Sequence, residues 1–425
     1  MPHRSLWRAE LARWPFLTLT ATALLASAGW AWTRPEPASL GEPGALGSPI
    51  PVRPRPLPIT IYPIEGWAPE RRDLVVAADV LRPYFRRNKV PVSLVYHAMR
   101  LWGPDVPFSP RDVPIEPSEG LTGEGLFLRC LTDQRTYEAN SKFTLDRLLV
   151  PSPFGVQVVT SVVDVGWGQE WGSTHIGKYL QVMSDVEAPS DTPLMLAGDR
   201  PARLADVVQD EARRYHPTQE LEWVTCGLAR YLAVPRWQNR FGQWISFDDL
   251  AEILVKRPFG QSACEGTHAP YALATLLNAH TTSPLLSAGR AREVRERLLE
   301  YTRFLAGRQQ SDGSWTAGWW EDEHDGEHHK TGAAEGVHGK ITATGHILEW
   351  MVILPTELRP EPAALRRAAD FILATIPKLR EKILSDFHDY LPTSHALHAL
   401  VMAGGRRWAD PRWLEHTHFR SGYRD

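Results

Sequence analysis

Four stretches of the chain repeat apolar residues at steps of three and four, with Arg, Glu and Asp between them. This spacing places the apolar side chains on one face of a helix and the charged ones on the opposite face. The pattern therefore predicts surface helices with one buried face over Arg203–Tyr215, Phe247–Lys256, Arg290–Arg308 and Pro362–Ile376.

Six further segments are apolar on all sides and richer in small residues. Five of them carry a histidine near their start and the third carries a cysteine, at His97, His175, Cys226, His268, His346 and His395. A start that recurs every few tens of residues is typical of helical repeats. Six apolar inner helices ringed by amphipathic outer helices predict an all-α fold, an α/α toroid. A helical protein of two domains is the alternative.

Extended structure is indicated in one place. Residues Phe154–Val165 are rich in valine, which favours β-strands. The same run also fits a buried connector between helices.

The first 33 residues have the pattern of an export segment. Basic residues up to Arg13 precede Trp14–Trp32, an apolar run without a charge. Residues 1–33 therefore predict a signal peptide or a membrane anchor. Ala26-Ser27-Ala28 fits a cleavage site, whereas the length of the run fits an anchor, so both outcomes stay open. Either one places the domain on the extracytoplasmic side, and an uncleaved segment would make the membrane a partner.

A region dense in proline and glycine follows at residues 34–58. This composition predicts an extended, semi-rigid linker. The helical domain is then expected over residues 59–425.

The charge of the chain is nearly balanced, with 47 basic and 50 acidic residues and a net charge of −3. We find no basic stripe of the kind that nucleic-acid binding needs. A small molecule, a glycan or a protein remains possible as the ligand.

The end of the predicted helix over Arg290–Arg308 carries a short motif. Gln310-Ser311-Asp312-Gly313-Ser314-Trp315 has the form Gln-x-x-Gly-x-Trp, and Gln238-Asn239-Arg240-Phe241-Gly242-Gln243-Trp244 is a looser copy with one extra residue. Such a motif builds a corner, in which Gln caps the helix, Gly turns the chain and Trp packs back. Over roughly Val92–Gly405 the chain resembles the repeat proteins of the squalene cyclase and protein prenyltransferase superfamily, and the resemblance implies an α/α toroid.

The resemblance does not extend to the chemistry of that superfamily. Its cyclases use an Asp-x-Asp-Asp acid, which this sequence lacks; Asp248-Asp249 stands where a helix cap is expected. Its prenyltransferases hold zinc with an Asp, a Cys and a His, and the Asp-x-Cys spacing is also missing. The activity is therefore undetermined at this point.

The starts of the inner helices are the expected place for a site. If they all lie at one mouth of the toroid, their histidines converge there with the positive ends of the helix dipoles. The catalytic candidates around that mouth are His268, His346, Glu265 and Tyr271. The structural alternative is that each histidine bonds a neighbouring repeat and closes the ring.

One cluster has the composition of a zinc site. Cys264 stands four residues before His268, and Cys226 begins the preceding inner segment. Cys226, Cys264, His268 and His346 could therefore hold Zn²⁺ in a tetrahedral arrangement. Lanthionine cyclases, which are also α/α toroids, carry a Cys, Cys, His zinc site of this general kind. A disulfide between Cys226 and Cys264, with Cys130 buried, is the alternative.

Three other interpretations remain. The acidic and histidine-rich run Glu321–Lys330 could bind a cation, but its composition is typical of a solvated loop. A glycan-processing enzyme would use tryptophan platforms and a carboxylate, His or Tyr as acid and base; the candidates are Trp167, Trp171, Trp223, Trp315, Trp319, Trp320 and Trp350, with Glu170, Glu222, Glu265, His268, Tyr271 and Glu349. A non-catalytic envelope scaffold that binds a protein is the third class.

Overall fold

The computed structural model describes residues 49–82, 91–104, 125–140, 147–159, 175–217, 219–320, 336–385, 387–410 and 412–415. Helices predominate and strands are few, so the prediction of a mainly helical protein is confirmed for this part of the chain. The predicted signal or anchor segment and the run Glu321–Lys330 lie outside it. Within these ranges, no helix is both long and apolar enough to cross a membrane.

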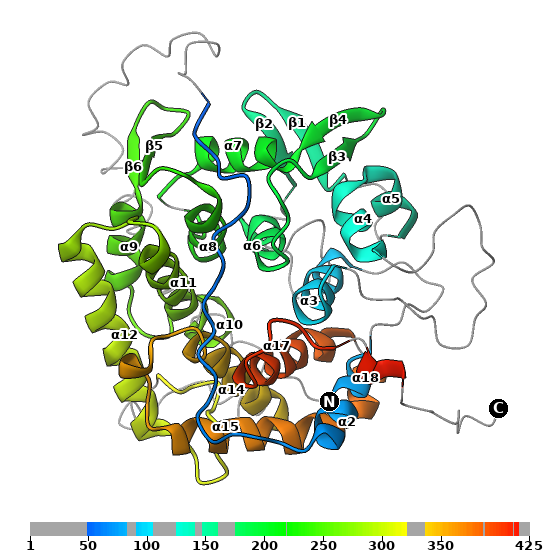
Figure 1. The fold of residues 1–425 in the computed structure, drawn as a ribbon, viewed down its shortest axis with the longest axis vertical. Coiled ribbons are helices and arrows are strands. Elements are labelled where there is room, and N and C mark those ends of the chain that lie inside the picture. Colours follow the sequence, from blue (N-terminus) through cyan, green and yellow to red (C-terminus); the bar gives the residue numbers. More distant parts are fainter. Residues whose placement is uncertain are drawn as a thin grey trace, which may run out of the picture. The chain divides into compact units, whose positions relative to one another are not determined.

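Six helices correspond to the predicted inner segments, and each packs against the next. Contacts join α3 to α6, α6 to α8, α8 to α11, α11 to α14 and α14 to α17, and α17 in turn packs against α3 (Figure 1). The helices are α3 (Val92–Trp102), α6 (Lys178–Asp185), α8 (Glu222–Tyr231), α11 (His268–Thr282), α14 (Val337–Met351) and α17 (Phe387–Ala403).

Glycine permits the closest of these contacts. A Cβ atom at Gly345 of α14 would lie 2.7 Å from the Cα of Ala396 in α17, and one at Gly227 of α8 would lie 2.7 Å from the Cβ of Leu180 in α6. Real Cβ atoms do not approach other atoms so closely, so a larger residue would separate the helices. The small residues that set these segments apart in the sequence are therefore needed for their packing.

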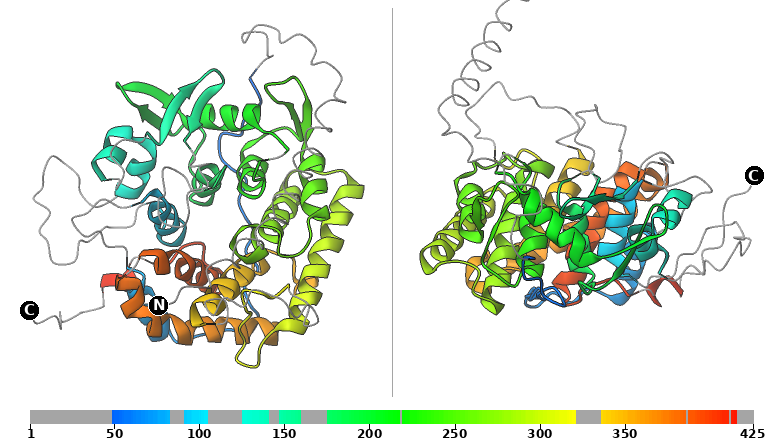
Figure 2. Two further views of the ribbon diagram at one scale, coloured as in Figure 1. Left: turned by 180° about the vertical axis from the view of Figure 1, so that it is seen from behind. Right: turned by 90° about the horizontal axis from the view of Figure 1, so that it is seen from above.

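The predicted amphipathic helices form with nearly the expected bounds. They are α7 (Leu204–Arg214), α9 (Phe247–Lys256), α12 (Ala288–Arg308) and α15 (Pro362–Thr375). In the views from front and back, α12 and α15 lie outside the inner helices α11 and α14 (Figure 1, Figure 2). The Ser246 and Asp249 side chains form a capping box at the start of α9, as expected for that position.

The other helices are short or peripheral. They are α2 (Arg71–Val80), α4 (Leu126–Thr132), α5 (Gln134–Asn140), α10 (Ala263–Gly266), α16 (Arg380–Ser385) and α18 (Arg412–Glu415), with 3₁₀ turns η1 (Thr356–Leu358) and η2 (Ile376–Leu379).

Three antiparallel hairpins make up the strands of the described ranges. The pairs are β1 (Leu149–Ser152) with β2 (Gly155–Val158), β3 (Pro193–Leu196) with β4 (Arg200–Arg203), and β5 (Arg236–Gln238) with β6 (Trp244–Ser246). The predicted extended run thus contains β2, and its residues 160–165 lie outside the described ranges. The two other hairpins were not expected, because strands of three or four residues are too short for a periodic signal.

The Gln-x-x-Gly-x-Trp corner follows α12. Gly313 has a φ of 90°, a conformation that other residues rarely adopt. Trp315 is fully buried and its Nε1 donates to the carbonyl of Leu305 at 2.8 Å. The glutamine that spans the corner is Gln309, which donates to the carbonyls of Gly313 and Ala364. The motif is therefore a structural corner, as the sequence predicts.

An extended strap, residues 49–67, crosses the carboxyl ends of the inner helices (blue in Figure 1). Its backbone amides donate to the carbonyls of Tyr231 at 2.7 Å, of Val352 at 2.7 Å and of Ala403 at 3.0 Å. The last carbonyls of a helix have no partner within it, and the strap supplies one to α8, α14 and α17. Residues 49–58, which the sequence assigned to the linker, thus lie against α8, with Ile50 and Leu57 buried.

Asn278 joins the strap to α11. Its amide donates to the carbonyls of Thr60 and Ile353, both at 2.8 Å, and its Oδ1 accepts from the Thr60 amide at 2.9 Å. We expect Asn278→Ala to lower the free energy of unfolding by about 2–4 kcal/mol, because it leaves buried backbone groups unpaired. Urea denaturation measures this loss. Thr281→Ala, at an exposed site on the same helix, should change it by less than about 0.5 kcal/mol, and equal effects would contradict the role of Asn278.

Glu211 of α7 is a buried carboxyl group. Burial, with a smaller effect of Asp210, raises the pKa of Glu211 to about 7 even though Arg214 lowers it. The folded protein therefore holds a proton that the unfolded chain releases above pH 4.5, so stability falls as pH rises from about 4.5 to 7 and is then constant. We expect Glu211→Gln to remove on the order of 2 kcal/mol of this dependence. Melting temperatures across this range check it, with the exposed Glu296→Gln as the control that keeps the wild-type slope.

Candidate metal site

A buried layer of charge lies between the inner helices, toward the ends that the strap crosses. Arg100 of α3 donates to Asp185 of α6 at 2.9 Å, to Glu349 of α14 at 2.9 Å and to the hydroxyl of Tyr271 of α11 at 3.0 Å. The side chains of Arg100 and Glu349 are 2% and 1% exposed. Glu349 and Tyr271, which the sequence predicts as catalytic candidates, belong to a packed ionic network.

The remaining two inner helices also contribute to this layer. Arg230 of α8 pairs with Asp185 at 2.7 Å. His395 and His398 of α17 place their Nδ1 atoms 2.7 and 2.6 Å from the Glu349 carboxylate. Burial alone would raise the pKa of Glu349, but Arg100 and His395 hold it well below its usual value. Glu349 is therefore an anion, and both histidines can donate to it.

A row of imidazoles lies next to the charged layer. Successive ring centroids are separated by 4.6 Å from His97 to His395, 4.0 Å from His395 to His346, 5.8 Å from His346 to His268 and 5.3 Å from His268 to His175. The histidines that begin the predicted repeats thus meet in space. His346 and His395 lie well inside α14 and α17 rather than at their starts, because both helices begin several residues earlier than the sequence pattern suggests.

Burial keeps four of these five histidines uncharged. It lowers the pKa of His97, His268 and His395 well below the usual value, with neighbouring histidines adding to the effect. Burial likewise lowers the pKa of His346 to about 4. A neutral imidazole keeps one nitrogen with a free lone pair, which is the form that binds metals.

Two members of the row have unused nitrogens. His268 is 1% exposed, packs against Trp223 with centroids 4.4 Å apart, and neither of its ring nitrogens has a hydrogen-bond partner. His346 donates from Nδ1 to the Thr342 carbonyl at 2.8 Å, while its Nε2 has no partner. A buried polar atom without a partner costs about 1–3 kcal/mol, so these nitrogens point to a ligand.

His268 lies in the one group of possible metal ligands found in the described ranges. A ring nitrogen of His175, the Sγ of Cys264 and a ring nitrogen of His268 all lie within 4.8 Å of one another. Ligand atoms around a tetrahedral zinc ion are about 3.5 Å apart, so small side-chain rotations would bring these three to bonding distance. The Nδ1 of His175 also lies 2.8 Å from Oε1 of Glu220, the carboxylate contact common behind a zinc-bound histidine.

The short helix α10, which precedes α11, holds Cys264 in an unusual conformation. Cys264 has a φ of 48°, which costs a non-glycine residue of order 1–3 kcal/mol and is frequent at functional sites. The backbone of Gly266 packs closely against that of Gly260, since a Cβ atom at Gly266 would lie 2.5 Å from the Cα of Gly260. Cys264 is half-buried, and the side chains of His175 and Glu220 are 25% and 24% exposed. A small ligand can therefore reach the group from this side.

Lys178, at the start of α6, lies near the same group. Its Nζ is 3.7 Å from the centroid of the Trp223 ring. Burial and the charge of Arg100 lower the pKa of Lys178 to about 7. Much of the positive charge that would repel a metal ion is therefore lost near neutral pH.

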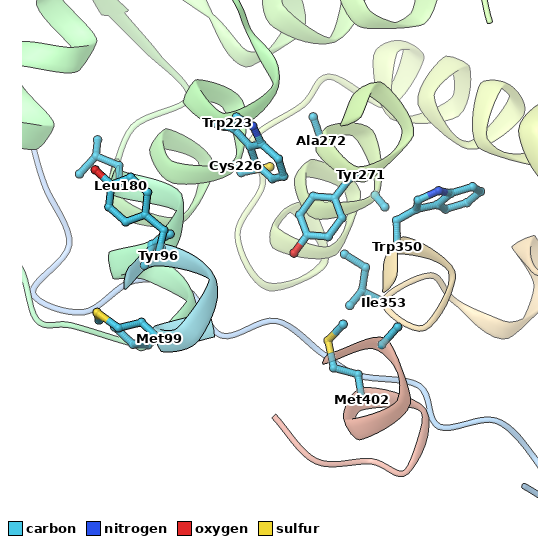
Figure 3. Close-up of a cluster of buried hydrophobic side chains, with 14 of the residues drawn as sticks. Tyr96, Met99, Leu180, Trp223, Cys226, Tyr271, Ala272, Trp350, Ile353 and Met402 are labelled. Atoms are coloured by element: carbon cyan, nitrogen blue, oxygen red, sulfur yellow. The ribbon is translucent and has the colours of Figure 1, made fainter. Parts of the chain in front are cut away.

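The structure thus brings together only part of the predicted zinc set. Cys264 and His268 are in the group, and His346 is the neighbour of His268 in the row. Cys226 is buried among apolar side chains beside Trp223 (Figure 3), where burial raises its pKa to about 12. In the described ranges no disulfide joins Cys130, Cys226 or Cys264 to another cysteine. Glu265 belongs to α10, directly after Cys264.

The sequence predicts that His175 converges with the other histidines at the mouth, but it does not place His175 in the zinc set and does not indicate Glu220 beside it. No spacing along the chain relates His175 to Cys264. Arg100 and Asp185 were also missed, although charged residues within otherwise apolar segments were a usable signal.

The tryptophans proposed as glycan platforms are mostly structural. Trp223, Trp315, Trp319 and Trp350 are at most 2% exposed, so they cannot stack on a sugar. Trp167 and Trp171 lie outside the described ranges.

Comparison with family models, curated proteins and solved structures yields no match for this chain.

Arg100 offers a test of the charged layer. We expect Arg100→Ala to lower the free energy of unfolding by about 3–5 kcal/mol, because it leaves Glu349 buried without its cation. Chemical denaturation followed by circular dichroism gives the value. The exposed Arg303→Ala on α12 is the control and should cost less than about 0.5 kcal/mol; a similar small loss at Arg100 would show that the layer is not needed for stability.

Proposed function

We propose that this chain is an extracytoplasmic α/α-toroid protein with a zinc-dependent site at the mouth of the toroid. The observation that carries the proposal is the convergence of His175, Cys264 and His268 around a buried histidine whose two nitrogens are unpartnered. Export or anchoring rests on the sequence of residues 1–33.

The toroid is supported by the contacts of the inner helices. The sequence of contacts from α3 through α17 and back to α3 is what a closed ring of six helices requires. The corner at Gly313 and Trp315 adds the feature by which the sequence resembles the squalene cyclase and prenyltransferase repeat proteins. The reaction of those proteins is not implied, because their acid motif and ligand spacing are missing.

The donor set of the site suits zinc. Two neutral imidazoles and a thiolate are borderline and soft ligands, a combination that favours Zn²⁺ over Mg²⁺ or Ca²⁺. Three protein ligands leave a fourth position, as in catalytic rather than structural zinc sites. When bound there, zinc would lower the pKa of a water or thiol in the open position, or polarise a carbonyl.

The chain's own residues would support such chemistry in stated ways. Glu220 orients His175 through its Nδ1 and so leaves Nε2 for a ligand. His346 holds its Nδ1 proton against the Thr342 carbonyl, which leaves the Nε2 lone pair to accept a hydrogen bond from a group bound beside His268. The buried row excludes bulk water from this side of the site.

A second function is favoured by one specific observation. Cys264, with its strained backbone, His175 and Glu220 have the order of a nucleophile, a base and an orienting carboxylate. The same three residues could therefore act without metal as a cysteine nucleophile in acyl transfer.

Metal content decides between these functions. The full chain, purified without chelator, is expected to hold close to one zinc per chain, and Cys264→Ala, His268→Ala and His175→Ala should each lose most of it. Cys226→Ala is the matched control and should keep the metal, because Cys226 lies apart from the ligand group. Cobalt in place of zinc should give thiolate-to-metal absorption that Cys264→Ala abolishes.

Alkylation of Cys264 supplies the complementary result. For a zinc site, iodoacetamide should modify Cys264 only after a chelator is added. A second outcome is that the chain holds no metal, that its Cys264 reacts rapidly, and that His175→Ala or Glu220→Gln slows this reaction. This outcome would contradict the zinc site and support the cysteine nucleophile. A chain with neither metal nor a reactive Cys264 would refute both functions.

A further inference from the structure

The β5–β6 hairpin exposes two aromatic side chains, Phe241 and Trp244. Trp244 is 61% and Phe241 is 48% exposed, and apart from them only Val76 and Val337 are exposed large hydrophobic residues in the described ranges. The hairpin contains the looser copy of the Gln-x-x-Gly-x-Trp motif. In the first copy Trp315 is fully buried, whereas in this copy Trp244 faces solvent.

The hairpin is built rigidly, so this exposure is not a loose end of the chain. Asn239 is fully buried, and its Oδ1 accepts from the amides of Phe241 and Gln243 at 3.0 Å each. Trp237 is 2% exposed and donates from Nε1 to the Ala212 carbonyl of α7 at 2.9 Å. The packing role of a corner tryptophan thus falls to Trp237, and the turn holds Phe241 and Trp244 outward.

Each exposed ring is accompanied by an arginine. The guanidinium carbon of Arg236 lies 4.9 Å from the Trp244 ring centroid, and that of Arg240 lies 4.7 Å from the Phe241 ring centroid. The stretch Arg236–Trp244 contains no acidic residue. Asp248 and Asp249, which follow it, accept from the Ser287 and Ser246 amides. The tip therefore presents aromatic surface with positive charge.

The folded unit also begins beside this hairpin. The carbonyl of Pro51 accepts from the amide of Ala233 at 2.9 Å, three residues before β5, and the amide of Ile50 donates to Gln209 of α7. The preceding 48 residues include the apolar run Trp14–Trp32. The chain that leads to that run therefore joins the folded unit next to the hairpin.

We propose that Phe241 and Trp244, with Arg236 and Arg240, form a lipid-contact surface that docks the folded unit on a bilayer containing anionic phospholipid. Aromatic side chains are favoured at the level of the headgroups, and arginines near an anionic surface are attracted to it. The hairpin and the N-terminal run would then engage the same membrane. An acidic glycan could meet the same charge, but the tether to an apolar run favours lipid.

The test uses the full chain in vesicles of phosphatidylcholine with or without phosphatidylglycerol, with brominated acyl chains as the quencher of tryptophan fluorescence. Trp14, Trp30 and Trp32 would also be quenched, so the measured quantity is the difference between wild type and Trp244→Phe. We expect Trp244→Phe to lose part of the quenching in anionic vesicles. Equal quenching of the two proteins would overturn the proposal.

A second measurement separates charge from apolar contact. Trypsin cleavage after Arg240, which is exposed, should slow several-fold in anionic vesicles and little in phosphatidylcholine alone. Phe241→Ala with Trp244→Ala should abolish this protection, whereas Val337→Ala, an exposed apolar residue elsewhere, should keep it. Protection by a soluble acidic polysaccharide but not by vesicles would assign the surface to a glycan and refute the lipid proposal.

Discussion

The packing of the inner helices depends on the pairing of Arg100 with Asp185 and Glu349. These three side chains come from α3, α6 and α14, which are far apart in the sequence, and all of them are largely buried. A buried charge is tolerated only when its partners are close and its hydrogen bonds are satisfied. The pairing therefore fixes how far these helices stand from one another, and Arg230 and the histidines of α17 extend the same condition to the neighbouring helices.

The imidazole row lies beside that layer but differs from it in charge. The arginines and carboxylates of the layer stay charged because they pair with one another, whereas His97, His268, His346 and His395 are buried and stay neutral. Neutrality leaves lone pairs inside the protein, and at His268 and His346 nothing in the described ranges uses them. Unpaired polar atoms in the interior lower the stability of the fold, but they hold possible ligand atoms in a fixed geometry.

The two ends of α11 show how access is arranged. At its carboxyl end Asn278 binds the strap, and nearby Ile59 and Ile61 help to line a cavity of about 30 Å³, about the volume of one water molecule. At its amino end His268 meets Cys264 and the partly exposed His175. The candidate metal group thus lies at the amino end, where His175 is partly exposed, while the strap crosses the carboxyl end.

The sequence by itself determined the helices, their two classes and the corner at Gly313 and Trp315, because periodicity, small residues and turn residues act over a few neighbouring positions. It also marked Cys264 and His268, which are four residues apart. It could not determine that His175 rather than Cys226 joins them, or that Trp237 rather than Trp244 is buried. The tertiary structure decided these points, since the side of a helix that faces the ring, and the distance between residues on different helices, follow from packing rather than from spacing along the chain.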